Sequence, residues 1–319
     1  MVYVDLVTGF LGAGKTTFIR QYTKYLVGRN ERVGIVENDY GSINVDALLL
    51  QDLVSDDVRL EMVAGGCDND CYRRRLKTKL LTLALQGYSR ILVEPSGIFD
   101  VEEFFDILQE EPLYERVQIH NVITVVNANL GRLSEQSGYL LVSQIANAGK
   151  VVFSFWDNQN PRELMDIING YLKQQRCGRQ LTQEDIVCLP FENYTSLIFD
   201  SLNHAGYHTY SYERQYDDSV YTSLFFMNHN VQDIRKTVGN LFSDEFCGRV
   251  IRIKGCYCSD EVWYAVNATK DMLRIHPMKN GQSVLIVIGE QLDESVISQY
   301  IPAEYSTLQV NQNSNTGSE

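Results

Sequence analysis

The sequence predicts an α/β protein of two domains, in which a doubly wound, mostly parallel sheet is followed by a smaller α+β domain. Three observations predict this organisation. Short β-branched apolar runs alternate with helical patterns from Met1 to about Leu202. Several of these runs lack strict polar alternation, which is typical of strands covered on both faces. Near Tyr207 the pattern changes to a polar, Tyr-rich stretch.

The first domain is expected over residues 1–205. Its strands are predicted at the apolar runs Val2–Val7, Val33–Val36, Val58–Val63, Ile91–Val93, Val122–Val126 and Val151–Phe153. The clearest helix is predicted over Arg73–Gln86, where leucines recur at helical spacing. Asp70 can cap its start and Gly87 follows its end.

Residues 206–221 are expected to form a linker, 222–305 the second domain, and 306–319 a disordered tail rich in Ser, Asn and Gly. The second domain is predicted to contain, in order, a strand, a helix, three strands and a helix. These elements are Leu224–Met227, Val231–Phe242, Arg249–Lys254, Val262–Asn267, Val284–Ile288 and Glu294–Tyr300.

The composition is that of a soluble globular protein, with 44% hydrophobic and 22% charged residues. A formal net charge of −13 argues against partners such as nucleic acid or an anionic membrane surface. No apolar run has the length of a membrane span, and the N-terminus lacks the features of a signal peptide, so we expect a cytoplasmic protein. Seven scattered cysteines do not form a disulfide pattern, and in a reducing compartment clustered cysteines are more often metal or redox sites.

Residues 9–16 match the phosphate-binding pattern Gly-x-x-x-x-Gly-Lys-[Ser/Thr]. A predicted strand leads into this loop, and an amphipathic helix over Thr16–Leu26 follows it. Backbone N–H groups would converge there on phosphates, Lys15 would reach the β and γ oxygens, and Thr16 would ligate Mg²⁺. The nucleotide-binding residues predicted here are Gly9, Gly12, Ala13, Gly14, Lys15, Thr16 and Thr17.

A second acidic position follows the buried strand near residue 91. Glu94 lies at the tip of that strand, where a carboxylate belongs beside Mg²⁺ and the γ-phosphate, so Glu94 and Lys15 are the predicted catalytic residues. The N–H of Gly97 can sense the γ-phosphate, and Ser96-Gly97 can move as a switch. The sequence therefore predicts a P-loop nucleoside-triphosphatase that hydrolyses GTP or ATP.

Together these segments resemble the CobW-like family of P-loop GTPases, which are metallochaperones or metalloenzyme activators related to the urease- and hydrogenase-maturation GTPases. The resemblance is carried by GFLGAGKTT, Glu37-Asn38-Asp39-Tyr40-Gly41 with Asp46, Gly65-Gly66-Cys67, Glu94-Pro95-Ser96-Gly97, Gln144-Ile145-Ala146, and residues 248–255 and 288–293. It implies a CobW-type C-terminal domain, GTP and Mg²⁺ as cofactors, and a client metalloenzyme or apo-protein as partner. The switch residues that it implies are Glu37, Asn38, Gly41 and Asp46.

The cysteine segment departs from the family pattern Cys-x-Cys-Cys, because this chain has Cys67-Asp68-Asn69-Asp70-Cys71. Two thiolates could bind Zn²⁺, Co²⁺ or Ni²⁺, with Asp70, Glu37 or a water completing the site. The alternative is that Asp70 caps the following helix and both cysteines are structural. Five scattered histidines argue against bulk metal storage.

The base-recognition motif also departs from the family. Ser154-Phe155-Trp156-Asp157 stands where Asn-Lys-x-Asp specifies guanine. Asp157 could still accept from N1–H and the 2-amino group of guanine, and the Phe155 ring could stack on a purine. GTP is therefore favoured, and ATP remains an alternative.

The resulting hypothesis is a nucleotide-gated GTPase that inserts or delivers a metal to a client metalloenzyme, or activates it. The alternative is a metal-independent regulatory NTPase or chaperone that remodels a partner such as a corrinoid enzyme; a third hypothesis, a small-molecule kinase, lacks a recognisable lid. We find no arginine finger or water-positioning Gln, so a homodimer or a client would complete the site. We expect Cys256 and Cys258 to be semi-buried core thiols, with a second metal or redox site as the alternative. We expect Arg73-Arg74-Arg75 to be a solvated helix face, with a clamp for a phosphate or a partner carboxylate as the alternative.

Overall fold

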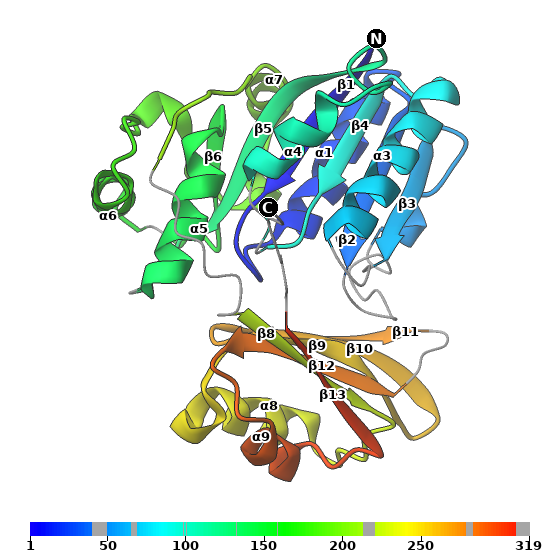
Figure 1. The fold of residues 1–319 in the computed structure, drawn as a ribbon, viewed down its shortest axis with the longest axis vertical. Coiled ribbons are helices and arrows are strands. Elements are labelled where there is room, and N and C mark those ends of the chain that lie inside the picture. The colour runs from blue at the N-terminus through cyan, green and yellow to red at the C-terminus, as the bar shows by residue number, and fades with distance from the viewer. Residues whose placement is uncertain are drawn as a thin grey trace, which may run out of the picture. The chain divides into compact units, whose positions relative to one another are not determined.

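The computed structural model describes residues 1–39, 50–64, 69–97, 99, 101–131, 133–157, 159–212, 221–278 and 283–310. The chain divides into two compact units, of which the first contains the described residues up to Tyr212, apart from Asn69, and the second contains those from Tyr221. Each unit is built on its own sheet (Figure 1). In the described residues we find no helix with the length and hydrophobicity that a bilayer span requires.

The first unit contains a seven-stranded sheet in the order β3-β2-β4-β1-β5-β6-β7, and every pair in it is parallel. The strands are β1 (Val2–Thr8), β2 (Val33–Asp39), β3 (Val58–Ala64), β4 (Arg90–Glu94), β5 (Val117–Asn127), β6 (Lys150–Ser154) and β7 (Ile186–Val187). The helices are α1 (Lys15–Gly28), α3 (Asn69–Leu85), α4 (Val101–Leu108), α5 (Glu135–Ala146), α6 (Pro161–Gln174) and α7 (Ser196–Asn203). The predicted doubly wound α/β fold is confirmed.

Helices cover both faces of this sheet, as expected for strands without polar alternation (Figure 1). On one face, α1 and α7 pack on the strands through a core of large apolar side chains. Its members include Val7, Phe18, Ile19, Tyr22, Leu26, Ile35, Leu92, Ile123, Val125, Val152, Phe199 and Leu202. Because every strand pair in this sheet is parallel, the carboxyl ends of the strands all meet at one edge of the sheet. Ligands bind at this edge in such folds.

The second unit is a six-stranded antiparallel sheet in the order β11-β10-β9-β12-β8-β13. Its elements are β8 (Tyr221–Met227), α8 (Ile234–Ser243), β9 (Arg249–Ser259), β10 (Val262–Thr269), β11 (Met272–Met278), β12 (Val284–Glu290), α9 (Glu294–Tyr300) and β13 (Tyr305–Val310). Helices α8 and α9 cover one face (Figure 1). The predicted α+β class of this unit is confirmed.

Two strands of the second sheet were not predicted. Strand β11 carries Arg274, His276 and Pro277, so it lacks an apolar run; it pairs with β10 on one side only. Strand β13 pairs with β8, and the prediction of a disordered tail from residue 306 was therefore wrong up to Val310. An edge strand is hydrogen-bonded to one neighbouring strand only. Its position depends on that backbone pairing, so its sequence need not show the apolar run that identifies a central strand.

The first described residues of the predicted linker contact the first unit. Tyr207 forms an isolated bridge with Ala148, and the His208 N–H donates to the Asn147 carbonyl at 3.0 Å. The Tyr212 ring lies 5.8 Å from that of Tyr139. Gly206 is also bonded to β5, since its N–H donates to Asn121 Oδ1 at 2.8 Å and its carbonyl accepts from the Val122 N–H at 2.9 Å. These contacts have no periodicity that the sequence could reveal.

Candidate nucleotide site

The predicted phosphate loop connects the end of β1 to the start of α1. Gly9 has φ +143°, and a Cβ there would lie 2.1 Å from the Val125 carbonyl oxygen, so no other residue fits without moving β5. Gly14 is the N-cap of α1 and brings no capping side chain. The first N–H groups of α1 follow directly, and such a helix N-terminus favours a bound anion. The geometry of residues 9–17 suits a phosphate.

Lys15, Thr16 and Glu94 form a buried cluster beside this loop. The Thr16 Oγ1 donates to Glu94 Oε1 at 3.0 Å, and the Lys15 Nζ lies 4.0 Å from the same oxygen. Lys15 Nζ also donates to the carbonyl of Phe10 at 3.4 Å. The cluster forms because β4 pairs with β1, which places the last residue of β4 next to the loop that follows β1.

This cluster has the donors that Mg²⁺ prefers. A hydroxyl and a carboxylate are hard oxygen ligands, and a magnesium ion in proteins takes one or two of them together with water and phosphate oxygens. Thr16 Oγ1 and Glu94 Oε1 lie close enough to share one ion. The predicted magnesium pair therefore fits the structure.

Gly97 is packed against the phosphate loop. A Cβ at this position would lie 2.6 Å from the Leu11 nitrogen and 2.9 Å from the Phe10 carbonyl carbon. The Gly97 carbonyl accepts a hydrogen bond of 3.0 Å from the Nε2 of Gln144, a fully buried residue of α5. The predicted γ-phosphate sensor is thus in contact with the loop that it would report on.

Glu37 lies at the same edge of the sheet. It stands near the end of β2, directly opposite Glu94 in the register of the two parallel strands, and only 1% of it is exposed. Two buried acidic residues therefore occupy paired positions on adjacent strands, and one of them, Glu94, contacts Thr16 of the phosphate loop. Neighbouring carboxylates in a buried site favour a bound cation or proton.

The remaining switch and metal predictions are only partly within the described residues. Gly41, Asp46 and Cys67 lie outside them, as do the side chains of Asn38 and Asp70. Cys71 is half-buried in the first part of α3. No group of three or more His, Cys, Asp or Glu able to hold a metal occurs in the part of the chain that the structure describes. The predicted metal set stays a prediction.

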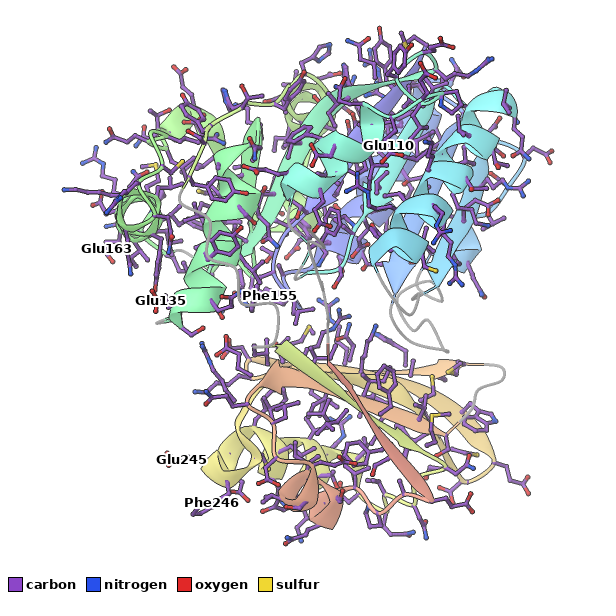
Figure 2. All side chains as sticks on the ribbon, viewed as in Figure 1. Glu110, Glu135, Phe155, Glu163, Glu245 and Phe246 are labelled. Atoms are coloured by element: carbon purple, nitrogen blue, oxygen red, sulfur yellow. The ribbon has the colours of Figure 1, made fainter. Side chains whose placement is uncertain are left out.

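The predicted base-recognition residues follow β6. Ser154 is buried, and its Oγ donates to the Val126 carbonyl at 3.3 Å. Phe155, labelled in Figure 2, has φ +52°, a backbone conformation that is rare for a bulky residue. Asp157 is exposed. The Ser154 Cβ lies 3.6 Å from where a Cβ on Gly14 would be, so this loop and the phosphate loop are adjacent.

Gln159 forms hydrogen bonds within the loop that follows β6, which we call the base loop. Its Oε1 accepts the Asp157 N–H at 2.6 Å, and its Nε2 donates to Asn129 Oδ1 at 3.0 Å and to the Phe155 carbonyl at 3.4 Å. One amide thus connects the loops after β5 and β6. No sequence pattern singled out Gln159, because its role depends on two loops meeting in space.

Phe191 is a second residue that sequence reasoning missed. Its ring lies 3.6 Å from the position of a Cβ on Gly14 and 6.0 Å from the ring of Phe18 in α1. It is near the loop because β7 pairs with β6, which brings the residues after β7 to the same edge. The two-residue β7 was too short to predict.

The two cysteines of β9, Cys256 and Cys258, differ in burial. Cys256 is fully buried, which raises the pKa of its thiol to about 11, whereas Cys258 is exposed, so the prediction of two core thiols was wrong for Cys258. Cys258 is exposed because it lies near the end of β9, where burial fades toward the hairpin. Arg73 pairs with Glu110 at 2.9 Å on the surface of the first unit, with Glu110 shown in Figure 2.

Comparison with known proteins places this geometry in a family. The model of the CobW/HypB/UreG nucleotide-binding domain matches residues 3–183, more than half of the 319-residue chain. Zinc chaperone YeiR of Escherichia coli (strain K12) is 29% identical over 189 residues, which are 58% of this chain and 56% of the relative. Zinc chaperone YjiA of the same organism is 27% identical over 166 residues, 49% of this chain and 50% of the relative. The chain spans about half the length of these relatives.

A solved structure of Zn(II)-bound YjiA GTPase from E. coli covers 94% of this chain and 97% of its own, at 15% identity and a TM-score of 0.36. The assignment depends instead on the match of the family model over residues 3–183, which contain the phosphate loop and Glu94. The chain therefore belongs to the CobW/HypB/UreG family, and residues 3–183 are its nucleotide-binding domain.

Proposed function

We propose that this protein is a GTPase whose nucleotide state controls delivery of a transition metal to a client metalloenzyme, or activation of that client. The observation that carries the proposal is the pairing of Glu37 with Glu94 at the end of adjacent strands. Glu94 contacts Thr16 and Lys15 at the phosphate site, and Glu37 is a predicted ligand of the metal. Relatives named zinc chaperones support a metal as cargo.

The phosphate end would act mainly by electrostatics. The Lys15 ammonium would neutralise charge on the β and γ oxygens, and the loop N–H groups would orient the phosphates. Thr16 and Glu94 would hold Mg²⁺, which supplies further charge stabilisation when bound. We expect slow hydrolysis by the isolated chain, because an arginine finger and a water-positioning Gln were not recognised in the sequence; a homodimer or the client would supply the missing group.

The base end would prefer guanine through Asp157. A single carboxylate can accept from N1–H and the 2-amino group of guanine, and adenine offers no such pair of donors. The Phe155 ring would stack on the purine where other family members use a lysine stem. Competition of GTP against ATP tests this part, and ATP preference would contradict it.

Metal control would follow from the change at the γ-phosphate. Its loss would alter Gly97 and Glu94, and Glu37 would transmit that change toward Cys67, Asp70 and Cys71, the other predicted ligands. Zn²⁺, Co²⁺ and Ni²⁺ all suit such a mixed sulfur and oxygen set. Reduced thiolates require a reducing compartment, and we therefore place the protein in the cytoplasm.

The decisive experiment measures metal affinity in two nucleotide states. Reduced wild-type protein and Cys67→Ser/Cys71→Ser are titrated with Zn²⁺, Co²⁺ and Ni²⁺, with GDP or with a non-hydrolysable GTP analogue. We expect the wild type to bind one metal at least about 10-fold more tightly in one state, which is the usual range of coupling between two sites. Cys258→Ser, an exposed cysteine of the second unit, is the matched control and should bind as the wild type does.

If the wild type binds no metal better than the double variant in either state, metal delivery is excluded. Nucleotide-dependent remodelling of a partner, without metal, would then be the function. The rewritten segment Cys67–Cys71 is the observation that favours this second candidate, since it lacks the family's adjacent cysteines.

A further inference from the structure

Gln144 is a buried amide whose side chain leaves α5 and reaches the switch residue Gly97. Its Nε2 donates to the Gly97 carbonyl at 3.0 Å, and the residue is 0% exposed. Its own carbonyl accepts from the Oγ1 of Thr124 in β5 at 2.7 Å. The backbone and side chain of Gln144 are therefore both fixed, one to the sheet and the other to Gly97.

The Gln144 side chain uses only part of its hydrogen-bonding capacity. Its Oε1 is buried and has no hydrogen-bond partner among the residues that the structure describes. A buried acceptor without a partner costs stability, and native proteins contain few of them. An apolar residue of similar volume would avoid this cost, so stability alone does not account for a glutamine at this position.

Gly97 is the point at which a small displacement would matter. Its Cα is so close to the phosphate loop that an added Cβ would lie 2.6 Å from the Leu11 nitrogen. The carbonyl that Gln144 holds belongs to the same residue as the N–H that would meet the γ-phosphate. Fixing that carbonyl therefore restricts the direction in which the N–H points, because one residue has only two soft dihedral angles.

We propose that Gln144 is a positioning residue that holds Gly97 where its N–H can receive the γ-phosphate, and that it thereby sets the preference for GTP over GDP. The inference rests on the proposed nucleotide function and deepens it. GDP has no γ-phosphate, so its affinity does not depend on where Gly97 points. The Gln144–Gly97 bond should then contribute to binding of the triphosphate alone.

The test compares two nucleotides on one variant. Gln144→Met keeps the approximate volume and removes the donor, and Gln144→Leu removes the donor with a shorter apolar side chain. Affinities for GDP and for a non-hydrolysable GTP analogue are measured with Mg²⁺ by calorimetry. We expect Gln144→Met to bind the analogue about 3- to 10-fold more weakly, the value of one neutral hydrogen bond, and GDP within a factor of about 2.

Ser143→Ala is the matched control. Ser143 is equally buried on the same helix, but its Oγ donates within the helix to the Leu140 carbonyl at 3.0 Å and makes no bond to Gly97. It should change both affinities little and in equal proportion. Thermal unfolding of each variant shows whether the fold is retained, and Gln144→Leu provides the measurement if Gln144→Met unfolds.

The possible outcomes distinguish failure of the role of Gln144 from failure of the GTPase function. Equal losses for GDP and analogue, or no loss at all, in a folded variant would overturn the role of Gln144. If the wild type itself binds neither nucleotide, the proposed GTPase function fails instead. A wild type that prefers the analogue, together with a Gln144 variant that does not, would support both.

Discussion

The phosphate end and the base end of the nucleotide site are built in different ways. Lys15, Thr16 and Glu94 are each at most 8% exposed and lie on or beside the two central strands β1 and β4. Asp157 is exposed and follows β6, whose outer neighbour β7 has only two residues. One end is part of the core, and the other is a surface loop next to the edge of the sheet.

This difference explains which motif is intact in this chain. At the phosphate end, a substitution would leave a buried charge without its partner or force the backbone apart, and either change costs several kcal/mol. At the base end, loop side chains can change without disturbing the core, since Gln159 and main-chain groups hold the loop. At the proposed site, triphosphate binding would therefore be tied to the fold, whereas base selectivity would be free to vary.

Loss of Lys15 should produce the largest effect. Lys15→Ala removes the cation that lies 4.0 Å from Glu94 Oε1 beside the phosphate loop, and it should lower the turnover of GTP by about 10³-fold, as for loss of one preorganised donor. Steady-state phosphate release measures this. Lys24→Ala, an exposed lysine on the same helix, should have no effect; equal rates for both variants would contradict the assigned phosphate end.

Asp157 provides the corresponding test at the base end. Asp157→Ala should lower the preference for GTP over ATP by about 10- to 100-fold, because a hydrogen bond to a charged group contributes about 1.5–3 kcal/mol. ATP turnover should stay unchanged, since Asp157 is an exposed loop residue away from the core. Competition binding with the two nucleotides is the measurement, and a retained GTP preference would show that guanine is read elsewhere.

Gly97 tests whether the phosphate end is packed as tightly as the distances indicate. Gly97→Ala should reduce the free energy of unfolding by about 1–3 kcal/mol, because its Cβ would overlap the backbone of Leu11. Gly170→Ala in α6 is the control, since a Cβ there meets nothing within 4 Å and alanine favours a helix. Urea denaturation measures both, and similar stability of the two variants would contradict tight packing.

The features that could be predicted from the sequence are those encoded by neighbouring residues, and the features that were missed depend on residues distant in the chain. The loop from Gly9 and the acid Glu94 were predicted because each is encoded by local residues at a strand end. Strand β13 and the contacts of Gln159 and Phe191 were not, because they depend on partners distant in the chain. The pairing of Glu37 with Glu94 required the strand order β2-β4-β1, which alternation of elements alone does not specify.

Substitution of Gln159 should give the smallest effect of these variants, and it tests whether the loop after β6 affects base selectivity alone. Gln159→Ala removes the acceptor for the Asp157 N–H and the donor to Asn129, so the loop should lose part of its order. We expect the preference for GTP over ATP to fall about 2- to 5-fold, less than for loss of Asp157 itself, because only neutral hydrogen bonds are lost. Competition binding again measures it.

Gln159→Glu separates the accepted bond from the two donated ones, because the carboxylate still accepts from the Asp157 N–H but cannot donate to Asn129 or to the Phe155 carbonyl. A preference between those of the wild type and Gln159→Ala would show that each bond contributes to base selectivity. An equal loss of GTP and ATP affinity in Gln159→Ala would instead mean that the base loop also supports the phosphates. The adjacency of Ser154 and Gly14 would then couple the two ends of the site, and they would not vary independently.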